Sequence, residues 1–147
     1  MKRLIITGIV LLAGISGQAA ADCTNNRISG GNNLLTLLSG NTVCGQRGSG
    51  ATQEQWQEEH LSGGQLWDFK RGTSDPVDPR KQVGTWSASN GANAAVTYSY
   101  TGGAGPYTYQ VYRVGAVGSN RYSFCTGSTE VVQIRLQTGT GSACASF

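Results

Sequence analysis

The sequence predicts an all-β domain: an antiparallel meander of seven or eight strands that forms a small barrel, with a short N-terminal helix and two disulfides. Three observations support this prediction. From residue 65 onward, short runs of β-branched and aromatic residues recur between turn dipeptides. Several of these runs alternate apolar and polar residues with a period of two. Four cysteines, an even number, follow an export leader.

Residues 1–21 are expected to be a signal peptide. Lys2 and Arg3 give a positive start, an apolar run follows at 4–15, and the alanines at 19–21 provide the small residues of a cleavage site. We therefore expect residues 22–147 to form a single domain that is periplasmic or secreted from a Gram-negative bacterium. No apolar run after residue 21 has the length of a transmembrane helix, so a membrane-embedded protein is not expected.

Charge excludes a further class of function. The leader contains two of the eleven basic residues, so nine basic residues remain against eight acidic ones. A mature domain so close to neutrality lacks the basic surface that binds phosphate backbones. We therefore expect no nucleic-acid partner.

The elements follow in order along the chain. The leucine cluster at 34–38 predicts one or two turns of helix, with a buried strand as the alternative. A first strand is expected at 41–46, and 55–60 fits either a strand or a helical turn. Six further strands are expected at 65–70, 82–88, 96–101, 107–114, 122–124 and 132–136. An apolar sheet face of this size is covered by curling into a barrel, and the short connections favour up-and-down order.

The cysteines are Cys23, Cys44, Cys125 and Cys144, and two disulfides among them allow three pairings. Pairing Cys23 with Cys44 and Cys125 with Cys144 closes two short loops, whereas pairing Cys23 with Cys144 joins the ends of the domain. The sequence leaves the pairing open. No two cysteines lie within four residues and there is one histidine, so we expect no metal and no cofactor.

The tyrosines predict an aromatic face. Five of the six, Tyr98, Tyr100, Tyr107, Tyr109 and Tyr112, lie on two consecutive predicted strands. Such a face either forms the core of the sheet or provides a platform for a sugar, a peptide or another protein. Tyr112 breaks the two-residue alternation, so it is the tyrosine expected to point outward.

Three short motifs carry a resemblance. They are the LSGNTV stretch at 38–43, the Gly-Thr-Trp run at 84–86 and the YSFC stretch at 122–125. Their order resembles that of small exported proteobacterial β-rich proteins of unassigned function. The Gly-x-Trp element also resembles the first strand of the calycins, which include the lipocalins, where the tryptophan closes one end of a barrel. The calycin resemblance implies a carrier of small apolar ligands.

Catalytic groups are few. His60 stands beside Glu58 and Glu59 and is expected to be an exposed residue at a strand end. The three acids Glu58, Glu59 and Asp68 are interpreted as a solvated face. The chain contains no Gly-x-Ser-x-Gly nucleophile motif, so we expect no enzyme. A hydrolase built on His60 is the catalytic alternative, and it requires a carboxylate within hydrogen-bond reach of the imidazole.

These observations predict an exported, non-enzymatic β-domain that binds a protein or a saccharide partner, for example as an inhibitor. The alternative is a calycin-like carrier of a small apolar ligand, and a surface assembly subunit is a further possibility. The candidate ligand-binding residues are Trp67, Trp86, Tyr98, Tyr112 and Phe124.

Overall fold

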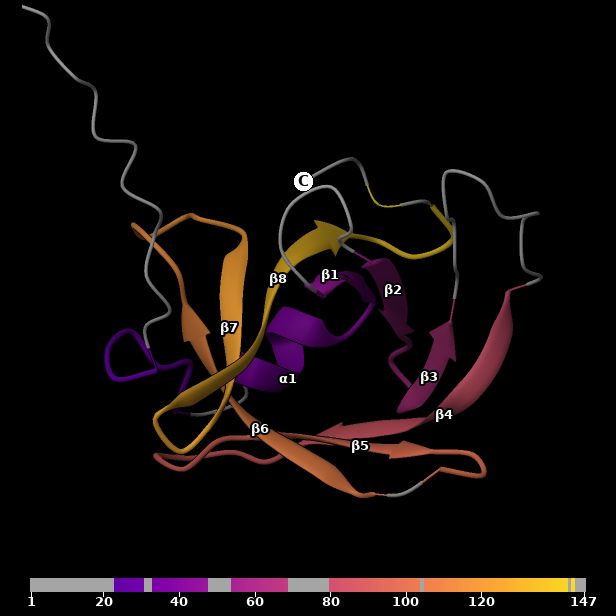
Figure 1. Cartoon of the computed structure of the whole chain (residues 1–147), viewed down its shortest axis with the longest axis horizontal. Helices are drawn as coiled ribbons and strands as arrows, with labels where there is room; N and C mark the ends of the chain where they lie inside the picture. Colours follow the sequence, from indigo (N-terminus) through magenta and orange to yellow (C-terminus); the bar gives the residue numbers. More distant parts are fainter. Residues whose placement is uncertain are drawn as a thin grey trace, which may run out of the picture.

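The computed structural model describes residues 23–30, 33–47, 54–68, 80–103, 105–142 and 144, and the predicted signal peptide at 1–21 lies outside them. The described residues form one helix and eight strands (Figure 1). In chain order these are α1 (Asn33–Leu38), β1 (Asn41–Arg47), β2 (Glu54–His60), β3 (Gln65–Asp68), β4 (Lys81–Ala88), β5 (Val96–Tyr100), β6 (Tyr107–Arg113), β7 (Arg121–Thr126) and β8 (Thr129–Thr138).

The strands form a closed antiparallel barrel. Each strand pairs with its neighbour in the sequence, and β8 closes the barrel by pairing with β1 over Asn41–Gly45. The predicted meander barrel is therefore confirmed, with eight strands, and the ambiguous segment at 55–60 is strand β2. The predicted helix is also confirmed, as α1. Because the barrel is closed, it has no edge strand with a full row of unpaired backbone N–H and C=O groups.

Strand register separates an inner from an outer face. Val43, which is fully buried, pairs with Glu58, which in turn pairs with Asp68, so all three project to the same side. In the same way, Trp86 pairs with Tyr98. The hydrophobic core consists mainly of these inward residues. Alternate residues, such as Thr42 and Glu59, project to the outer wall.

Residues 23–30, the N-terminal arm, complete a gap in the wall. β5 begins at Val96, opposite Tyr109, so the second half of β6 has no partner on that side. The arm supplies one, because the amide of Ile28 donates to the carbonyl of Val111 at 2.8 Å and the amide of Arg113 donates to the carbonyl of Asn26 at 3.0 Å. Backbone hydrogen bonds to β6 therefore hold the polar arm in place, in addition to side-chain packing.

Helix α1 closes the barrel end at which β1 begins and β2 ends. Leu34 and Leu38, four residues apart on one helix face, are both buried in the core. The helix ends at Leu38, and Gly40 follows two residues later, with a left-handed φ of 72° that favours glycine and an amide that donates to the carbonyl of His60 at 2.7 Å. Figure 1 shows α1 within the ring of strands. We call this the helix end.

The disulfides pair Cys23 with Cys125 and Cys44 with Cys144. This is neither the pairing that closes two short loops nor the one that joins Cys23 to Cys144. Each bond spans about a hundred residues, with sequence separations of 102 and 100. Long loops restrict the unfolded chain most, by about 5 kcal/mol per bond in the chain-entropy model. The structural reason is the closed barrel, which places the arm against β6 and β7 and the C-terminal segment against β1.

Candidate functional site at the aromatic end of the barrel

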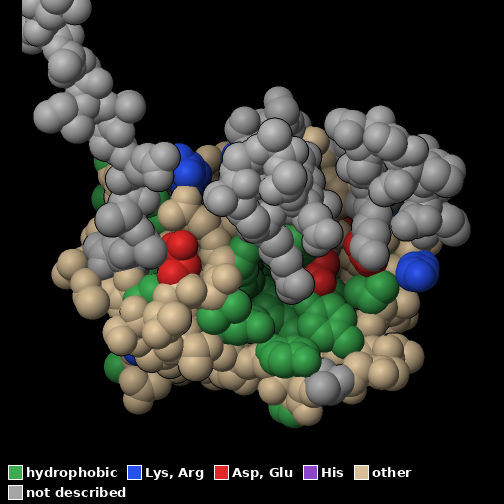
Figure 2. Space-filling model, in the orientation of Figure 1, with side chains coloured by type: hydrophobic (Ala, Val, Ile, Leu, Met, Phe, Trp, Pro, Cys, Tyr) green, Lys and Arg blue, Asp and Glu red, His purple; other side chains and the backbone are tan. Residues whose placement is uncertain are grey.

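The barrel end opposite α1 gathers aromatic and acidic side chains. Its hairpins connect β1 to β2, β3 to β4, β5 to β6 and β7 to β8. The inward-facing residues nearest these hairpins are half-buried or exposed rather than buried. We define the aromatic end by six of them: Trp56, Glu58, Asp68, Tyr100, Tyr107 and Tyr109. Figure 2 shows one face of the molecule on which apolar side chains gather centrally, with acidic side chains at their edge.

Strand alternation places these side chains. Trp56 and Glu58 lie two residues apart on β2, and Asp68 pairs with Glu58 across β3. On the opposite wall Tyr98 pairs with Tyr107. Because paired residues project to the same face, Glu58 and Asp68 face the barrel interior, as do four tyrosines of β5 and β6: Tyr98, Tyr100, Tyr107 and Tyr109.

Trp56 depends on a glycine. Gly45 lies across from it in the β1–β2 register, and the tryptophan ring occupies the space where a side chain at position 45 would begin. A Cβ atom at position 45 would lie 2.0 Å from Cε2 of Trp56, which is closer than any real contact. The pairing of the largest side chain with the smallest residue is what lets the indole lie inside the barrel rather than above it.

A hydrogen bond joins the two walls at this end. The hydroxyl of Tyr100 donates to Oε1 of Glu58 at 2.7 Å. A phenol donating to a carboxylate is a charge-assisted bond, so it fixes both side chains more firmly than a neutral pair would. Glu58 therefore keeps a defined position, with its charge directed toward the tyrosines.

Deeper in the barrel lies a fully buried polar pair, His60 and Tyr98. Nε2 of His60 is 2.8 Å from the Tyr98 hydroxyl, and Nδ1 is 3.2 Å from the carbonyl oxygen of Glu58. A carbonyl can only accept, so Nδ1 carries the proton and Nε2 accepts from Tyr98. Burial lowers the pKa of His60 from 6.5 to about 3, and burial also raises the pKa of Tyr98. Both groups are therefore neutral at pH 7.

This pair corrects the expectation for His60. The residue is at a strand end, as predicted, but it is fully buried instead of exposed. The Trp86 ring packs edge-on against the imidazole, with ring centroids 4.9 Å apart. The groups that contact the two imidazole nitrogens are a phenol and a backbone carbonyl, whereas the hydrolase alternative requires a carboxylate there.

The aromatic rings form a continuous column between the two ends. Tyr98 stacks on Phe124 with centroids 6.1 Å apart and on Tyr100 at 6.4 Å. Tyr100 then contacts Tyr107 at 6.1 Å. Exposure rises along this column, from 2% at Tyr98 to 42% at Tyr107. The core tyrosines and the accessible tyrosines are therefore successive parts of one cluster.

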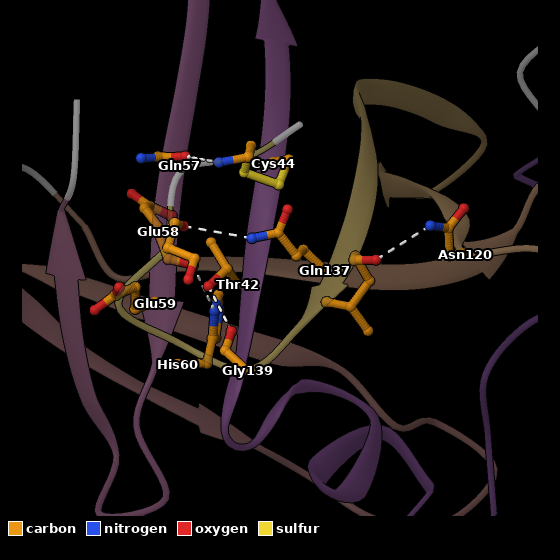
Figure 3. The surroundings of a disulfide bond; sticks show 12 residues. Thr42, Cys44, Gln57, Glu58, Glu59, His60, Asn120, Gln137 and Gly139 are labelled. Carbon is orange, nitrogen blue, oxygen red and sulfur yellow. Dashed lines mark hydrogen bonds between the residues drawn. A yellow bond between two sulfur atoms is a disulfide. The ribbon is translucent and has the colours of Figure 1, made fainter. Parts of the chain in front are cut away.

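The outer wall of β2 is covered by the C-terminal segment. Figure 3 shows Gln57 beside the disulfide of Cys44, with Glu59 further along the same strand. The amide of Cys144 donates to Oε1 of Gln57 at 2.6 Å, and the amide of Gly141 donates to Oε1 of Glu59 at 2.5 Å. The other carboxylate oxygen of Glu59 accepts from Nε of Arg80 at 2.5 Å.

Glu58, Glu59 and Asp68 are therefore not a solvated face. Glu59 is fully buried in the outer wall, whereas Glu58 and Asp68 project to the inside. The expectation failed because neighbouring residues of a strand project to opposite sides, so Glu58 and Glu59 have separate surroundings.

The candidate ligand-binding residues fall into two groups. Trp86, Tyr98 and Phe124 face the interior and are buried in the core. Trp67 faces outward on β3, where the Arg80 guanidinium lies 4.8 Å from its ring centroid, so it does not line the interior. Tyr112 points outward, as predicted, but it is buried with the Cys23–Cys125 disulfide.

Sequence reasoning missed Trp56, Glu58 and Asp68 as interior groups. The available signal was the two-residue spacing of Trp56, Glu58 and His60, which places them on one face if the segment is a strand. The segment also fitted a helical turn, so that spacing was not decisive.

Within the described part of the chain, no three histidine, cysteine or acidic residues are grouped so as to hold a metal ion. Among the same residues, no helix has both the length and the apolar character that crossing a bilayer requires. The chain matches no protein-family model, and no curated protein or solved structure matches it either.

Proposed function

We propose that this domain is a non-enzymatic binding protein whose partner, a protein or a saccharide, is held at the aromatic end of the barrel. The observation that supports this most is the gradient of exposure along the aromatic column. Tyr98 is 2% exposed, whereas Tyr107 is 42% exposed and Tyr100 and Tyr109 are half-buried. Aromatic rings that remain accessible bury large areas on binding at little cost in rotamer entropy.

The packing of the interior favours this proposal over the carrier of small apolar ligands. A carrier encloses its ligand, which requires internal volume. Three of the residues expected to line such a cavity, Trp86, Tyr98 and Phe124, are instead buried in one packed core cluster. Tyr98 and Phe124 stack on each other, and Trp86 packs on the His60 ring. Because these rings are packed against one another, the accessible aromatic surface is that of the tyrosines at the barrel end.

Export is part of the proposal. Two disulfides are compatible with an oxidising compartment. Together with the predicted leader at 1–21, they support a periplasmic or secreted protein.

The experiment is a comparison of three proteins on a heptapeptide library and a glycan array. The wild type is compared with Tyr107→Ala at the aromatic end and with Val131→Ala, which changes a residue on the outer wall that is 52% exposed. We expect ligands that the wild type and Val131→Ala bind alike and that Tyr107→Ala binds at least tenfold more weakly. If every ligand is bound equally by all three proteins, or if none is bound, the proposal is wrong.

A further inference from the structure

The barrel is complete before the C-terminal segment begins. β8 ends at Thr138 and closes the barrel by pairing with β1 over Asn41–Gly45, and no described residue after Thr138 belongs to a strand pair. The C-terminal segment, described at 139–142 and 144, instead lies against the outer wall of β1 and β2. If these residues moved away, the sheet would therefore lose no strand.

Two side chains of β2 hold the backbone of this segment. Oε1 of Gln57 accepts from the amide of Cys144, and Oε1 of Glu59 accepts from the amide of Gly141. Both side chains are buried beneath the segment, whereas Gly141 is exposed. Each contact is a single hydrogen bond from backbone to side chain, which water can replace at a small net cost. The covalent attachment of the segment is the disulfide between Cys44 and Cys144.

A glycine marks the place where the segment can turn away from the wall. Gly139 is fixed to β1, because its amide donates to Oδ1 of Asn41 at 3.1 Å and its carbonyl accepts from Oγ1 of Thr42 at 2.7 Å. Gly141 follows two residues later, with a left-handed φ of 82°. Glycine has the widest backbone freedom of any residue, so rotation at Gly141 can move Cys144 while Gly139 keeps its contacts.

The two disulfides differ in how a reductant can reach them. Cys23 and Cys125 are both buried and pack with Tyr112 in one cluster. Cys44 is also buried, but its partner Cys144 is partly exposed. A thiolate attacks a disulfide at one of its two sulfurs, so one accessible end is sufficient. A reductant can therefore reach the bond to Cys144 without opening the barrel wall.

We propose that the Cys44–Cys144 disulfide is a redox-sensitive switch, and that its reduction by a dithiol releases the C-terminal segment from the outer wall of β2. One thiolate of the dithiol attacks Sγ of Cys144, the S–S bond breaks, and Cys44 leaves as a thiolate that takes up a proton. The second thiolate of the dithiol then displaces Cys144, which is protonated in turn, and the dithiol becomes a disulfide.

Release changes the surface of the protein but leaves the barrel intact. It uncovers Gln57, Glu59 and the thiol of Cys44, which the segment now covers. Glu59 keeps its ion pair with Arg80, and water replaces the amide of Gly141 at its other oxygen. None of these groups belongs to the aromatic end, so the inference is independent of the proposed function.

The first test follows both disulfides during reduction of the oxidised wild-type protein. Dithiothreitol is added under native conditions, samples are quenched with acid, and the free thiols are alkylated after denaturation and located by mass spectrometry. We expect the bond of Cys44 with Cys144 to be reduced about tenfold or more faster than the bond of Cys23 with Cys125. Equal rates, or the reverse order, would overturn the inference.

The second test measures release by amide hydrogen exchange, with NMR detection. The wild type is compared with a variant that combines Cys44→Ser and Cys144→Ser and therefore lacks the proposed switch. We expect the amides of Gly141 and of position 144 to exchange about tenfold or more faster in this variant, while the amides in the β1–β8 ladder stay protected. Wild-type exchange rates at these two positions would contradict release. An equal acceleration in the β1–β8 ladder would do so too, because it indicates loss of the whole barrel.

The matched control combines Cys23→Ser and Cys125→Ser, which removes the other disulfide. That bond fixes the N-terminal arm, whose Ile28 amide donates to the carbonyl of Val111. We expect faster exchange at Ile28 and unchanged exchange at Gly141. Faster exchange at Gly141 in the control would show that the segment responds to general destabilisation instead of to its own disulfide, and would also overturn the inference.

Discussion

The two ends of this barrel use tyrosine in opposite ways. Tyr98 and Tyr100 lie two residues apart on β5 and face the same interior. Tyr98 is buried, and its hydroxyl donates toward the helix end, to the neutral imidazole of His60. At the aromatic end, Tyr100 is half-buried and donates to a carboxylate. The difference teaches that two tyrosines that face the same interior can have different roles, because the groups around each ring decide whether it is buried in the core or stays accessible.

The largest effect expected from this comparison is on stability. Trp86→Ala removes a buried ring and its hydrogen bond from Nε1 to the carbonyl of Leu61, and should cost about 4 kcal/mol of unfolding free energy. Tyr107→Ala at the aromatic end should cost less than about 1 kcal/mol, because the side chain is already 42% exposed and its removal therefore uncovers less buried surface. Urea denaturation of both variants measures the difference. Equal losses would show that the two ends do not differ in packing.

Acid should destabilise the protein through the helix end. His60 has a pKa near 3 when folded and 6.5 when unfolded, so below pH 6.5 the unfolded chain binds a proton that the folded chain does not. Its contribution to stability is therefore complete above pH 6.5 and falls by about 1.4 kcal/mol per pH unit down to about pH 3, or about 3 kcal/mol by pH 4.5.

Urea denaturation across this pH range, for wild type and His60→Gln, isolates the histidine from the carboxylates. Glutamine does not titrate but can accept the Tyr98 hydroxyl, so the variant should lose less stability on acidification. The assignment fails if both proteins show the same pH dependence.

Removing single hydroxyls compares the ends directly. Tyr98→Phe leaves Nε2 of His60 buried without a donor, which should cost about 2 kcal/mol. Tyr100→Phe removes the donor to Glu58 at the half-buried end, where water can replace it, so the loss should be about 0.5 kcal/mol. Thermal or urea unfolding ranks the two variants, and the reverse order would contradict the burial gradient.

The smallest expected effect concerns Trp56. A methyl group at position 45 cannot fit beneath the indole, so Gly45→Ala should displace the ring while costing about 1 kcal/mol of stability. Trp56 fluorescence, recorded in a protein with the other two tryptophans replaced by phenylalanine, should shift to longer wavelength as the indole becomes wetter. Unchanged emission would mean that the ring does not depend on this glycine.

Local patterns predicted much of the fold because they act within one element. The alternation of Val96, Tyr98 and Tyr100 with polar residues is a property of the strand itself, and it held in the structure. The interior side chains of the candidate site were harder to predict. Trp56 and Glu58 could be assigned to the interior only after the segment was known to be a strand, and Glu59 only after the C-terminal segment was known to cover it.

The sequence by itself determined the all-β class, the meander order, the short helix and the presence of four cysteines, because periodicity, turn residues and composition are local. Tertiary structure alone decided the disulfide pairing, since Cys23 meets Cys125 only when the arm fills the gap beside β6. It also decided which acids face inward and which tyrosines stay accessible. Those properties depend on barrel closure and on the position of α1, which bring together residues far apart in the chain.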